Sequence, residues 1–464
     1  MRKKNVLLVN WGTETAEYPL CEAVKLNKYD LYLAATEETP RVISKIFPVG
    51  HLIHTNPYDC SQLIEDVITF TKKSKFTFDI VTTFFEMNVY QAAVLANYLG
   101  CKRYLPSEIA LRTSVNKYLM RETIKRAGLA QPNFLRFNEK QLKKAFKFYR
   151  QLSSGAVIKP VHSGHSYGTR YVKKGLSLTS FKKLYRRARR DLSLHYDEWM
   201  DYENPNIIKN FLIEEYIDGL VISCDGVVSS PGKITFIGSA EFEISKPPEM
   251  QQIGHITPIA SLDKKQIKKC RNYVRRVVKE IGLQYCGFHC EMRWNNRNPL
   301  LLEISGRLPG GGLLPSHQAV SKFNIFDQFF SVFEGQAKKN YKRNVKVAKS
   351  ELLISGFTKQ KGVFVQVHPP KIQGKKYLIQ INTREGGEYL SPNSNPFKIG
   401  EWVYSLQLKS DKLSPIQLKE EGQRIKRGIV IELRRDLQFI ILVLFQVKLK
   451  KIIRVLKRML GRFL

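Results

Sequence analysis

The chain has 464 residues, which is enough for two or three domains or for one large enzyme with several lobes. Apolar residues make up 43% of it and aromatic residues 11%, an ordinary composition for a globular protein with a sizeable core. The N-terminus is basic, but only four apolar residues follow before polar ones. This pattern excludes a secretory signal peptide and predicts a first β-strand.

Seven cysteines are scattered along the chain. The closest pair, Cys286 and Cys290, lies on one predicted strand, where four residues span about 13 Å. That distance is too long for both thiolates to bind one zinc ion. We interpret the cysteines as reduced, mostly buried thiols of a cytoplasmic protein.

The formal net charge of +35 indicates an anionic partner: a nucleotide, an acidic substrate, nucleic acid or a membrane surface. The alternative is a Lys-rich, solvated surface with no special partner. Basic runs at 140–150 and 182–190 have the pattern of exposed helix faces whose other side carries Leu, Phe and Tyr. No zinc-finger spacing or aromatic RNA-binding signature accompanies them, so specific nucleic-acid binding is not predicted.

Strands alternate with helices over roughly the first hundred residues. Apolar segments predict strands at 6–9, 30–35 and 79–85, with helical patterns at 62–72 and 89–99. This alternation predicts a parallel, doubly wound sheet, although no dinucleotide-binding G-x-G-x-x-G follows the first strand. Glu86 comes directly after the strand at 79–85, at the end where such sheets bind ligands. It is either a substrate contact or an ordinary acid at a helix start.

A phosphate-binding loop is predicted after the first hundred residues. A helix at 114–127 carries Lys117, and a strand at 156–158 runs into Lys159 and Pro160. A turn of small residues follows, with Ser163, Gly164, Ser166, Gly168 and Thr169. Backbone N–H groups in such a turn can close on phosphate oxygens, and Lys159 adds a positive charge. The loop is not a Walker A motif, because no G-K-[ST] opens a helix.

A further strand is predicted at 211–217, where Glu214 and Glu215 face opposite sides. A carboxylate that faces the interior beside backbone N–H and C=O groups could read the amino edge of adenine. The alternative is an exposed acid on an edge strand.

Two apolar segments, 286–294 and 300–304, flank a polar turn and predict a β-hairpin. If the turn is centred near Arg297, Glu291 and Glu303 lie directly opposite each other, with Cβ atoms about 5 Å apart. Two carboxylates this close repel each other unless one is protonated or a cation lies between them. Oxygen ligands on a rigid sheet suit Mg²⁺. The alternative is an accidental pair in which one Glu points to solvent.

Side-chain alternation along the second strand places Leu301, Glu303 and Ser305 on one face. On this basis Ser305 shares the face of the predicted metal ligand Glu303.

The last part of the chain changes character. Strand patterns with Gly, Pro and Asn breaks at 345–408 predict a small β subdomain. The apolar run at 437–447 is only eleven residues long, whereas a transmembrane helix needs about twenty. Residues 449–463 alternate apolar and basic side chains at helical spacing, which predicts a helix able to lie on an anionic membrane. The alternative is a terminal helix docked on its own protein or on a partner.

Taken in order, these motifs resemble the ATP-grasp superfamily, and within it the carboxylate–amine ligases, including L-amino-acid ligases and, more distantly, biotin carboxylase. The resemblance covers about residues 5 to 340 and implies that ATP is held between two α+β halves. The matching residues are Lys117, Lys159-Pro160 with the Ser/Gly loop, Glu214-Glu215-Tyr216-Ile217-x-Gly219, Glu291 and Glu303-x-Ser305-x-Arg307.

The resemblance implies ATP and Mg²⁺, or Mn²⁺ in its place, as cofactors. It implies that Lys117 and Lys159 contact the phosphates and that the turn from Ser163 to Thr169 forms a lid over them. The adenine hinge would consist of Glu214, Glu215, Tyr216 and Ile217. Glu291 and Glu303, with Ser305, would hold the metal, and Arg307 would stabilise an acyl phosphate. Glu86 and His255 match positions that contact the substrates of amino-acid ligases.

Two positions depart from the family pattern. Val221 stands where a ribose-binding Glu is usual, and Ser305 stands where an Asn is usual. Serine is a shorter, neutral oxygen ligand that would bind the metal directly, through a water, or not at all. Val221 therefore affects the expected contact with ribose, and Ser305 affects the expected affinity for the metal.

The sequence thus predicts a protein of the α/β and α+β classes with the ATP-grasp fold. Its expected parts are an N-terminal parallel-sheet domain at 1–105, an ATP-grasp core at 106–340, a C-terminal β subdomain at 341–420 and a basic amphipathic tail at 421–464. We expect a cytoplasmic, ADP-forming ligase that joins an amino acid or a similar small acid to an amine, with peripheral membrane contact through the tail. The alternatives are another ATP-grasp enzyme, such as a carboxylase, and a scaffold that binds nucleotide or membrane without turnover.

Overall fold

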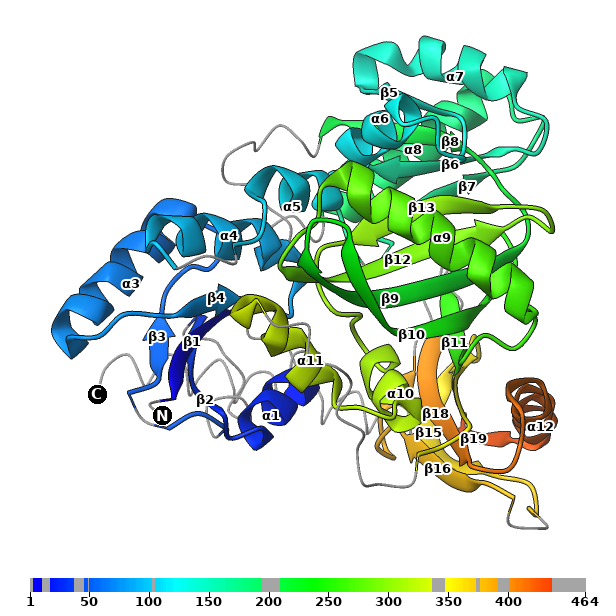
Figure 1. Ribbon diagram of the computed structural model, residues 1–464. Coiled ribbons are helices and arrows are strands. Elements are labelled where there is room, and N and C mark those ends of the chain that lie inside the picture. Colours follow the sequence, from blue (N-terminus) through cyan, green and yellow to red (C-terminus); the bar gives the residue numbers. More distant parts are fainter. Residues whose placement is uncertain are drawn as a thin grey trace, which may run out of the picture. The chain divides into compact units, whose positions relative to one another are not determined.

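The structure is a computed structural model that describes residues 3–10, 17–36, 46–48, 50–101, 105–164, 166–193, 209–335, 347–372, 376–390 and 400–435. The chain divides into two compact units (Figure 1). The first consists of residues 1–242 and 257–347, and the second of residues 243–256 and 348–464. The second unit therefore includes 243–256, a segment that the sequence prediction assigned to the core at 106–340.

The N-terminal part of the first unit is a parallel sheet with helices on both faces, as predicted. Its strands, in the order β3-β2-β1-β4, are β3 (Leu52–His54), β2 (Tyr29–Ala35), β1 (Lys4–Val9) and β4 (Ile80–Thr82). Its helices are α1 (Glu17–Lys25), α3 (Cys60–Ser74) and α4 (Val89–Tyr98). Alternation along β1 buries Val6 and Leu8 in the cluster that includes α1, and Leu7 and Val9 in the cluster that includes α3 and α4.

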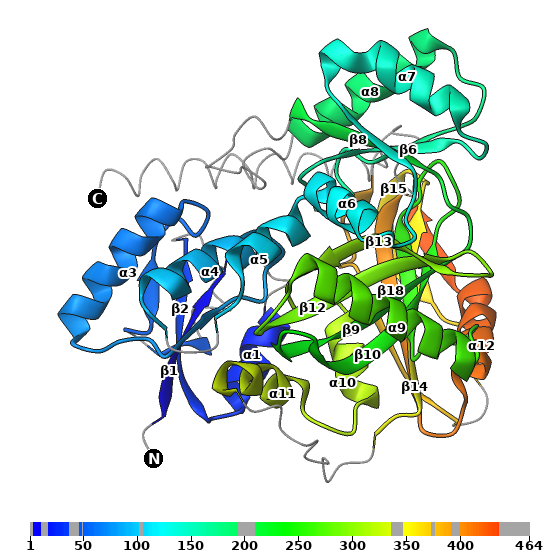
Figure 2. The same cartoon turned by 45° about the horizontal axis from the view of Figure 1, so that its top comes forward.

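A second, antiparallel sheet has the order β5-β8-β6-β7. The strands are β5 (Phe134–Phe137), β8 (Phe211–Glu215), β6 (Ala156–Pro160) and β7 (Arg170–Val172). Helices α7 (Leu142–Gln151) and α8 (Leu178–Ser193) contact these strands and each other. In Figure 2 the two helices lie at the top of the view, above β6 and β8. Helices α5 (Glu108–Val115) and α6 (Lys117–Arg126) precede this sheet in the chain.

The remaining strands of the first unit are four neighbours in the order β13-β12-β9-β10. These strands are β13 (Pro299–Ser305), β12 (Cys286–Trp294), β9 (Leu220–Ser230) and β10 (Lys233–Ile244). Helix α9 (Lys264–Ile281) begins with a capping box formed by Asp263 and Gln266 and ends at Gly282 in the left-handed conformation. Its apolar stripe packs on β9, β12 and β13, and forms the largest part of the core around the hairpin. Helices α10 (Leu313–Val320) and α11 (Ile325–Ser331) follow.

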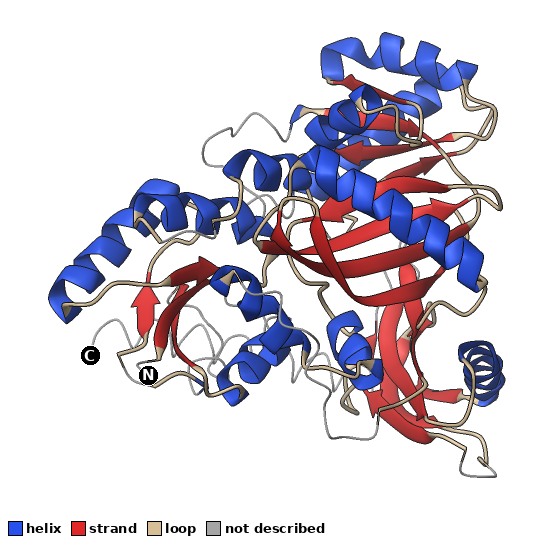
Figure 3. Ribbon diagram, in the orientation of Figure 1, coloured by secondary structure: helices blue, strands red, loops and turns tan. Residues whose placement is uncertain are grey.

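The second unit is rich in strands, as predicted for 345–408 (Figure 3). Four of its strands are neighbours in the order β11-β14-β18-β16: β11 (Gln252–Thr257), β14 (Ser350–Thr358), β18 (Glu401–Ser410) and β16 (Leu378–Thr383). A three-stranded sheet has the order β17-β15-β19, from β17 (Tyr389–Leu390), β15 (Gly362–His368) and β19 (Val430–Arg434). Helix α12 (Pro415–Gly428) buries Leu418 and Ile425 and contacts β14.

The predicted tail begins within folded structure. Its first residues, from 421, belong to α12, which buries Gly422 and Ile425, and to β19, which pairs with β15. The amphipathic pattern at 449–463 lies outside the described residues. Within the described part of the chain, no helix is long and apolar enough to cross a membrane. All seven cysteines are unpaired and five of them are buried, in agreement with the predicted burial.

Candidate active site

The hairpin of β12 and β13 places Glu291 and Glu303 directly opposite each other, which confirms the predicted register. The connecting turn is set by Asn295, whose side-chain oxygen accepts N–H bonds from Arg297 at 3.1 Å and Asn298 at 2.8 Å. Such Asx bonds fix a turn locally, so the register follows from the sequence itself.

One detail of the predicted hairpin was wrong. The pairing steps from Glu291–Glu303 to Met292–Leu301, so Leu302 is the additional residue of a β-bulge. Leu301 therefore lies with Met292 in the hydrophobic core, fully buried, and does not share the face of Glu303. The alternation rule fails here because the extra residue shifts the pairing by one position. Side chains before the bulge therefore point to the opposite face of the sheet from the one that simple alternation predicts.

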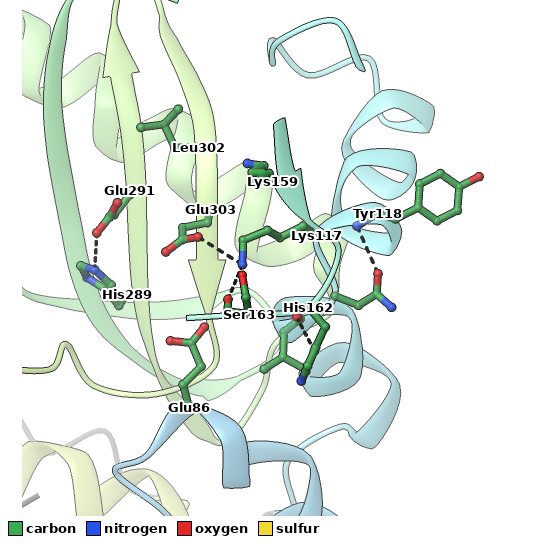
Figure 4. A network of polar contacts seen from close by, with 12 residues as sticks. Glu86, Lys117, Tyr118, Lys159, His162, Ser163, His289, Glu291, Leu302 and Glu303 are labelled. Carbon is green, nitrogen blue, oxygen red and sulfur yellow. Dashed lines mark hydrogen bonds and ion pairs between the residues drawn. The ribbon is translucent and has the colours of Figure 1, made fainter. Parts of the chain in front are cut away.

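Lys117 lies at the centre of the site (Figure 4). Its Nζ is 3.8 Å from Oε2 of Glu303 and donates a hydrogen bond of 2.6 Å to the carbonyl oxygen of Ser163. Asn116 caps helix α6 and makes Lys117 its first residue. The backbone N–H of Lys117 also bonds to Val161, which joins the helix start to the loop after β6. The structure thus brings together three elements that the sequence analysis considered separately.

The loop between β6 and β7 is a pair of consecutive turns. The N–H of Tyr167 bonds to the carbonyl of Gly164, and the N–H of Thr169 to the carbonyl of Ser166, both at 3.0 Å. Ser166 and Gly168 have positive φ angles, of 59° and 69°. A Cβ at Gly168 would lie 2.8 Å from the ring of Pro160, so glycine is required there.

A buried ion cluster lies beside the predicted phosphate-binding lysine Lys159. Both oxygens of Glu214 accept bonds from Arg121, at 2.8 and 3.1 Å, and Lys159 Nζ is 2.8 Å from the second oxygen. Burial opposes ionisation of Glu214, but the charges of Arg121 and Lys159 lower its pKa to about 2. Burial lowers the pKa of Lys159 to about 8. Attraction by Glu214 opposes this shift, whereas repulsion from Arg121 and Lys117 adds to it.

Arg121 was not singled out from the sequence. It is fully buried and also donates to the carbonyl oxygens of Leu301 and Leu302, at 2.9 and 2.8 Å. It therefore connects the bulge beside Glu303 to the Glu214–Lys159 pair. Its only sequence signal is its place one helical turn after Lys117, on the same face of α6.

The predicted hinge follows this cluster. Asn133 donates to Glu215 at 2.8 Å, and the ring of Tyr216 lies 5.5 Å from the guanidinium of Arg293. Glu215, Tyr216 and Ile217 are half-buried, whereas Glu214 is 3% exposed. Val221 is buried in the core and presents no polar group, in keeping with its departure from the family pattern.

Arg307 and Glu86 form an ion pair between the segment after β13 and the short helix after β4. Arg307 also donates to the carbonyl of Leu308 at 2.8 Å. Burial alone would raise the pKa of Glu86, but Arg307 and Lys117 together lower it. Figure 4 shows the Glu86 carboxylate directed toward Lys117 and Glu303. The assignment of Glu86 as a substrate contact stays a prediction.

The oxygen ligands on the hairpin fit a hard cation. Burial raises the pKa of Glu303. The charge of Lys117 opposes this shift, and repulsion from Glu291 and Glu86 adds to it. Ser305 is 3% exposed and its hydroxyl has no hydrogen-bond partner. Within the described ranges no group of three or more His, Cys, Asp or Glu could hold a metal. Mg²⁺, however, usually binds only one or two carboxylates and completes its shell with water and phosphate oxygens.

Comparison with known proteins gives the family of the central region. Residues 152–315 match the family model of the ATP-grasp domain. The chain contains an ATP-grasp domain. The match includes Lys159, the Ser/Gly loop, Glu214, both hairpin carboxylates and Arg307. No curated protein sequence matches the chain significantly.

Solved structures show that the likeness in fold extends over nearly the whole chain. An L-amino acid ligase from Bacillus licheniformis is 16% identical with a TM-score of 0.67, and the match covers 94% of this chain and 100% of that one. A phosphoribosylglycinamide synthetase from Anaerococcus prevotii is 16% identical with a TM-score of 0.58, covering 93% and 100%. The biotin carboxylase domain of a Hydrogenobacter thermophilus 2-oxoglutarate carboxylase, solved with MgADP and bicarbonate, is 15% identical with a TM-score of 0.63, covering 94% and 92%. The chain has the ATP-grasp fold, as the resemblance implied.

A buried network behind Glu291 was missed from the sequence. His289 bonds through Nδ1 to Asp225 at 2.6 Å and through Nε2 to Glu291 at 3.0 Å. The other oxygen of Asp225 accepts bonds from His317 at 2.6 Å and Ser223 at 2.7 Å. Burial alone would lower the pKa of His289, but Asp225 and Glu291 raise it to about 10. One carboxylate oxygen of Glu291 is therefore held by His289, which is itself held by Asp225.

His255 is buried in β11, within the second unit. Its assignment as a substrate contact stays a prediction.

Proposed function

We propose that this chain is an ATP-dependent ligase that activates a carboxylate as an acyl phosphate and joins it to an amine. One arrangement carries the proposal: the opposed carboxylates Glu291 and Glu303, with the Lys117 ammonium 3.8 Å from Glu303. The relatives with this fold include an amino-acid ligase and a domain that binds MgADP. The domain boundaries predicted at 105 and 340 belong to the same proposal.

The reaction has two steps that this site suits. An oxygen of the acid attacks the γ-phosphorus of ATP, the bond to the β-phosphate oxygen breaks, and ADP leaves with the electron pair. The amine nitrogen then attacks the carbonyl carbon, the C–N bond forms, and inorganic phosphate leaves as the amine loses a proton. Phosphoryl transfer of this kind needs mainly positioning and neutralisation of charge.

The residues divide this work. Lys117 and Lys159 would neutralise phosphate oxygens, and the Ser163–Thr169 loop would close over them and exclude water. Glu291 and Glu303, with Ser305, would hold Mg²⁺, which when bound supplies positive charge against the phosphates. Arg121 and Glu214 would act as positioning residues. Glu214 is bonded to Arg121 and Lys159, and the remaining donors of Arg121 are bonded to the carbonyl oxygens of Leu301 and Leu302.

The Glu86–Arg307 pair suggests the class of acid. A substrate carboxylate would compete with Glu86 for the Arg307 guanidinium, which can bind a carboxylate through two parallel bonds. Glu86 would then be available to the ammonium group of the same or the second substrate. An α-amino acid offers both charges at a short separation. The pair therefore favours an amino acid over a simple carboxylic acid.

Carboxylation is the second candidate, because the biotin carboxylase domain has a similar fold and was solved with bicarbonate. A phosphate-release assay with ATP and Mg²⁺ separates the two. We expect release only when both a pool of amino acids and an amine are present, with ADP formed in equal amount. Release that follows bicarbonate and biotin instead would favour carboxylation, and no release under any condition would refute the ligase proposal.

The network behind Glu291 predicts a change in metal requirement. Asp225→Asn weakens the hold on His289 and so on Glu291, and we expect the half-saturating Mg²⁺ concentration to rise about 10- to 100-fold. Direct titration of Mn²⁺ by electron paramagnetic resonance, with ADP present, measures the same change without turnover. Ser223→Ala removes another bond to Asp225 while leaving His289 in place, and should have little effect. Equal Mn²⁺ affinity in Asp225→Asn and the unmodified chain would contradict this role.

Lys159 predicts a limit at alkaline pH. With a pKa of about 8 it is charged at neutral pH and loses its charge as pH rises through 8. We therefore expect kcat/KM for ATP to fall about fivefold between pH 8 and 9, and about tenfold for each further pH unit. Lys159→Arg keeps the charge over this range and should flatten the profile. The same alkaline inflection in both proteins would assign the titration to another group.

A further inference from the structure

Positive charge is concentrated in one short segment of the first unit. Residues 138–193 contain 15 Lys and Arg against 2 acids, whereas the whole chain has 76 against 41. The two acids are already engaged: Glu139 pairs with Arg189, and Asp191 pairs with Arg170 and accepts the N–H of Gly168. The remaining cations of this segment have few carboxylates nearby to neutralise them.

Helices α7 and α8 present this charge on one side of the four-stranded sheet. Their buried residues pack inward, and the rings of Phe146 and Phe181 join the two helices at 5.6 Å. The outward stripes carry Lys143, Lys144 and Lys147 on α7 and Lys183, Arg186 and Arg190 on α8, all exposed. We call these six residues the basic face. Figure 2 shows the two helices on the outer side of β6 and β8.

A cavity adjoins the basic face. It has a volume of about 380 Å³ and includes Lys144, Lys125 and Arg136 in its lining, with Glu122 as its one acid. Two of these cations are held over aromatic rings: Arg136 lies 4.9 Å from the centroid of Tyr118, and Lys125 lies 5.9 Å from that of Phe134. A concave site with three cations suits a single phosphate-bearing group.

The chemistry of the surface favours a lipid headgroup over nucleic acid. Among the residues that the structure describes, none of the exposed large hydrophobic side chains lies on α7 or α8, so these two helices offer no aromatic platform for stacking bases. Stable membrane association usually takes two signals, a polybasic patch and an apolar anchor. The same sequence carries apolar and basic residues at helical spacing at 449–463, which is the pattern of the second signal.

We propose that the basic face and its cavity dock the chain on anionic phospholipid, with phosphate headgroups as the ligand. The attraction is electrostatic and acts without insertion of α7 or α8. It should therefore weaken steeply with salt, because the Debye length is about 10 Å at 0.1 M and shorter above it. The proposal is independent of the ligase activity.

Sedimentation with vesicles tests it on the full chain. Vesicles of phosphatidylcholine are compared with vesicles that contain 30 mol % phosphatidylglycerol, in the range of about 50 to 300 mM salt. The face variant is Lys144→Glu, Lys147→Glu, Lys183→Glu and Arg186→Glu together. The control has four reversals on exposed positions of α9, Lys264→Glu, Lys265→Glu, Lys268→Glu and Lys279→Glu, and changes the net charge equally.

We expect binding that requires phosphatidylglycerol, that the control keeps, and that the face variant loses by about 100-fold or more. Equal loss in both variants would show diffuse attraction and overturn the proposal. So would binding that disappears on removal of 436–464 but is unchanged in the face variant. A 20-base-pair duplex that displaces the chain from vesicles, with the same sensitivity to the face variant, would assign the surface to nucleic acid instead.

Discussion

Replacing Glu303 by Gln should reduce Mg²⁺-dependent turnover about 1,000-fold or more, because the hairpin loses one of its two opposed carboxylates. The shape of the side chain and the β12–β13 pairing are retained. Repulsion from Glu291 contributes to the raised pKa of Glu303, so the folded state does not favour a charge at this position. We therefore expect the melting temperature to stay equal or to rise slightly.

The measurement is steady-state turnover across a Mg²⁺ titration, beside a thermal melt and a nucleotide-binding titration without metal. Glu65→Gln, on an exposed position of α3, removes an equal charge far from the hairpin and should change nothing. Nucleotide binding without metal should survive in Glu303→Gln. Turnover within a few-fold of the unmodified chain would contradict the metal assignment, whatever the melting temperature.

Replacing Arg121 by Met should destabilise the fold by about 3–5 kcal/mol, because it leaves the buried Glu214 without its two-point partner. It also removes the donors to the carbonyls of Leu301 and Leu302. Arg121 is fully buried, so solvent cannot replace these bonds. Chemical denaturation at neutral pH measures the loss.

A matched pair of variants separates this effect from a general sensitivity of helix α6. Arg126→Met is exposed on the same helix and should cost no more than about 0.5 kcal/mol. The double variant Arg121→Met with Glu214→Gln should be more stable than Arg121→Met alone, because it no longer buries the unpaired carboxylate. If Arg121→Met and Arg126→Met cost the same, the ion cluster does not support the site.

The features that could be predicted are those set by local sequence. The Asn295 turn fixes the register of the hairpin, so the chain's own residue pattern was enough to place Glu291 and Glu303 opposite each other. The alternation of strands and helices likewise predicted the parallel N-terminal sheet. The bulge at Leu302 could not be predicted in this way, since its carbonyl groups are held by Arg121, which lies 180 and 181 residues away in the chain.

The supporting residues were missed for the same reason. Asp225 is an ordinary acid in a strand until His289, 64 residues later, and His317, 92 residues away, are brought to it by the fold. Glu214 was interpreted either as an adenine contact or as an exposed acid. Its buried pairing with Arg121 and Lys159 is a third outcome, and depends on α6 packing beside β6 and β8.

The central claim is that the acid is activated by phosphorylation of its carboxylate. Transfer of oxygen from the acid to inorganic phosphate tests this most directly. The chain is incubated with ATP, Mg²⁺, an amine and a pool of amino acids labelled with ¹⁸O in the carboxylate, and the released phosphate is analysed by mass spectrometry. Our account predicts one ¹⁸O in each phosphate released during ligation. Ligation that yields only unlabelled phosphate would contradict an acyl phosphate and the mechanism built on it.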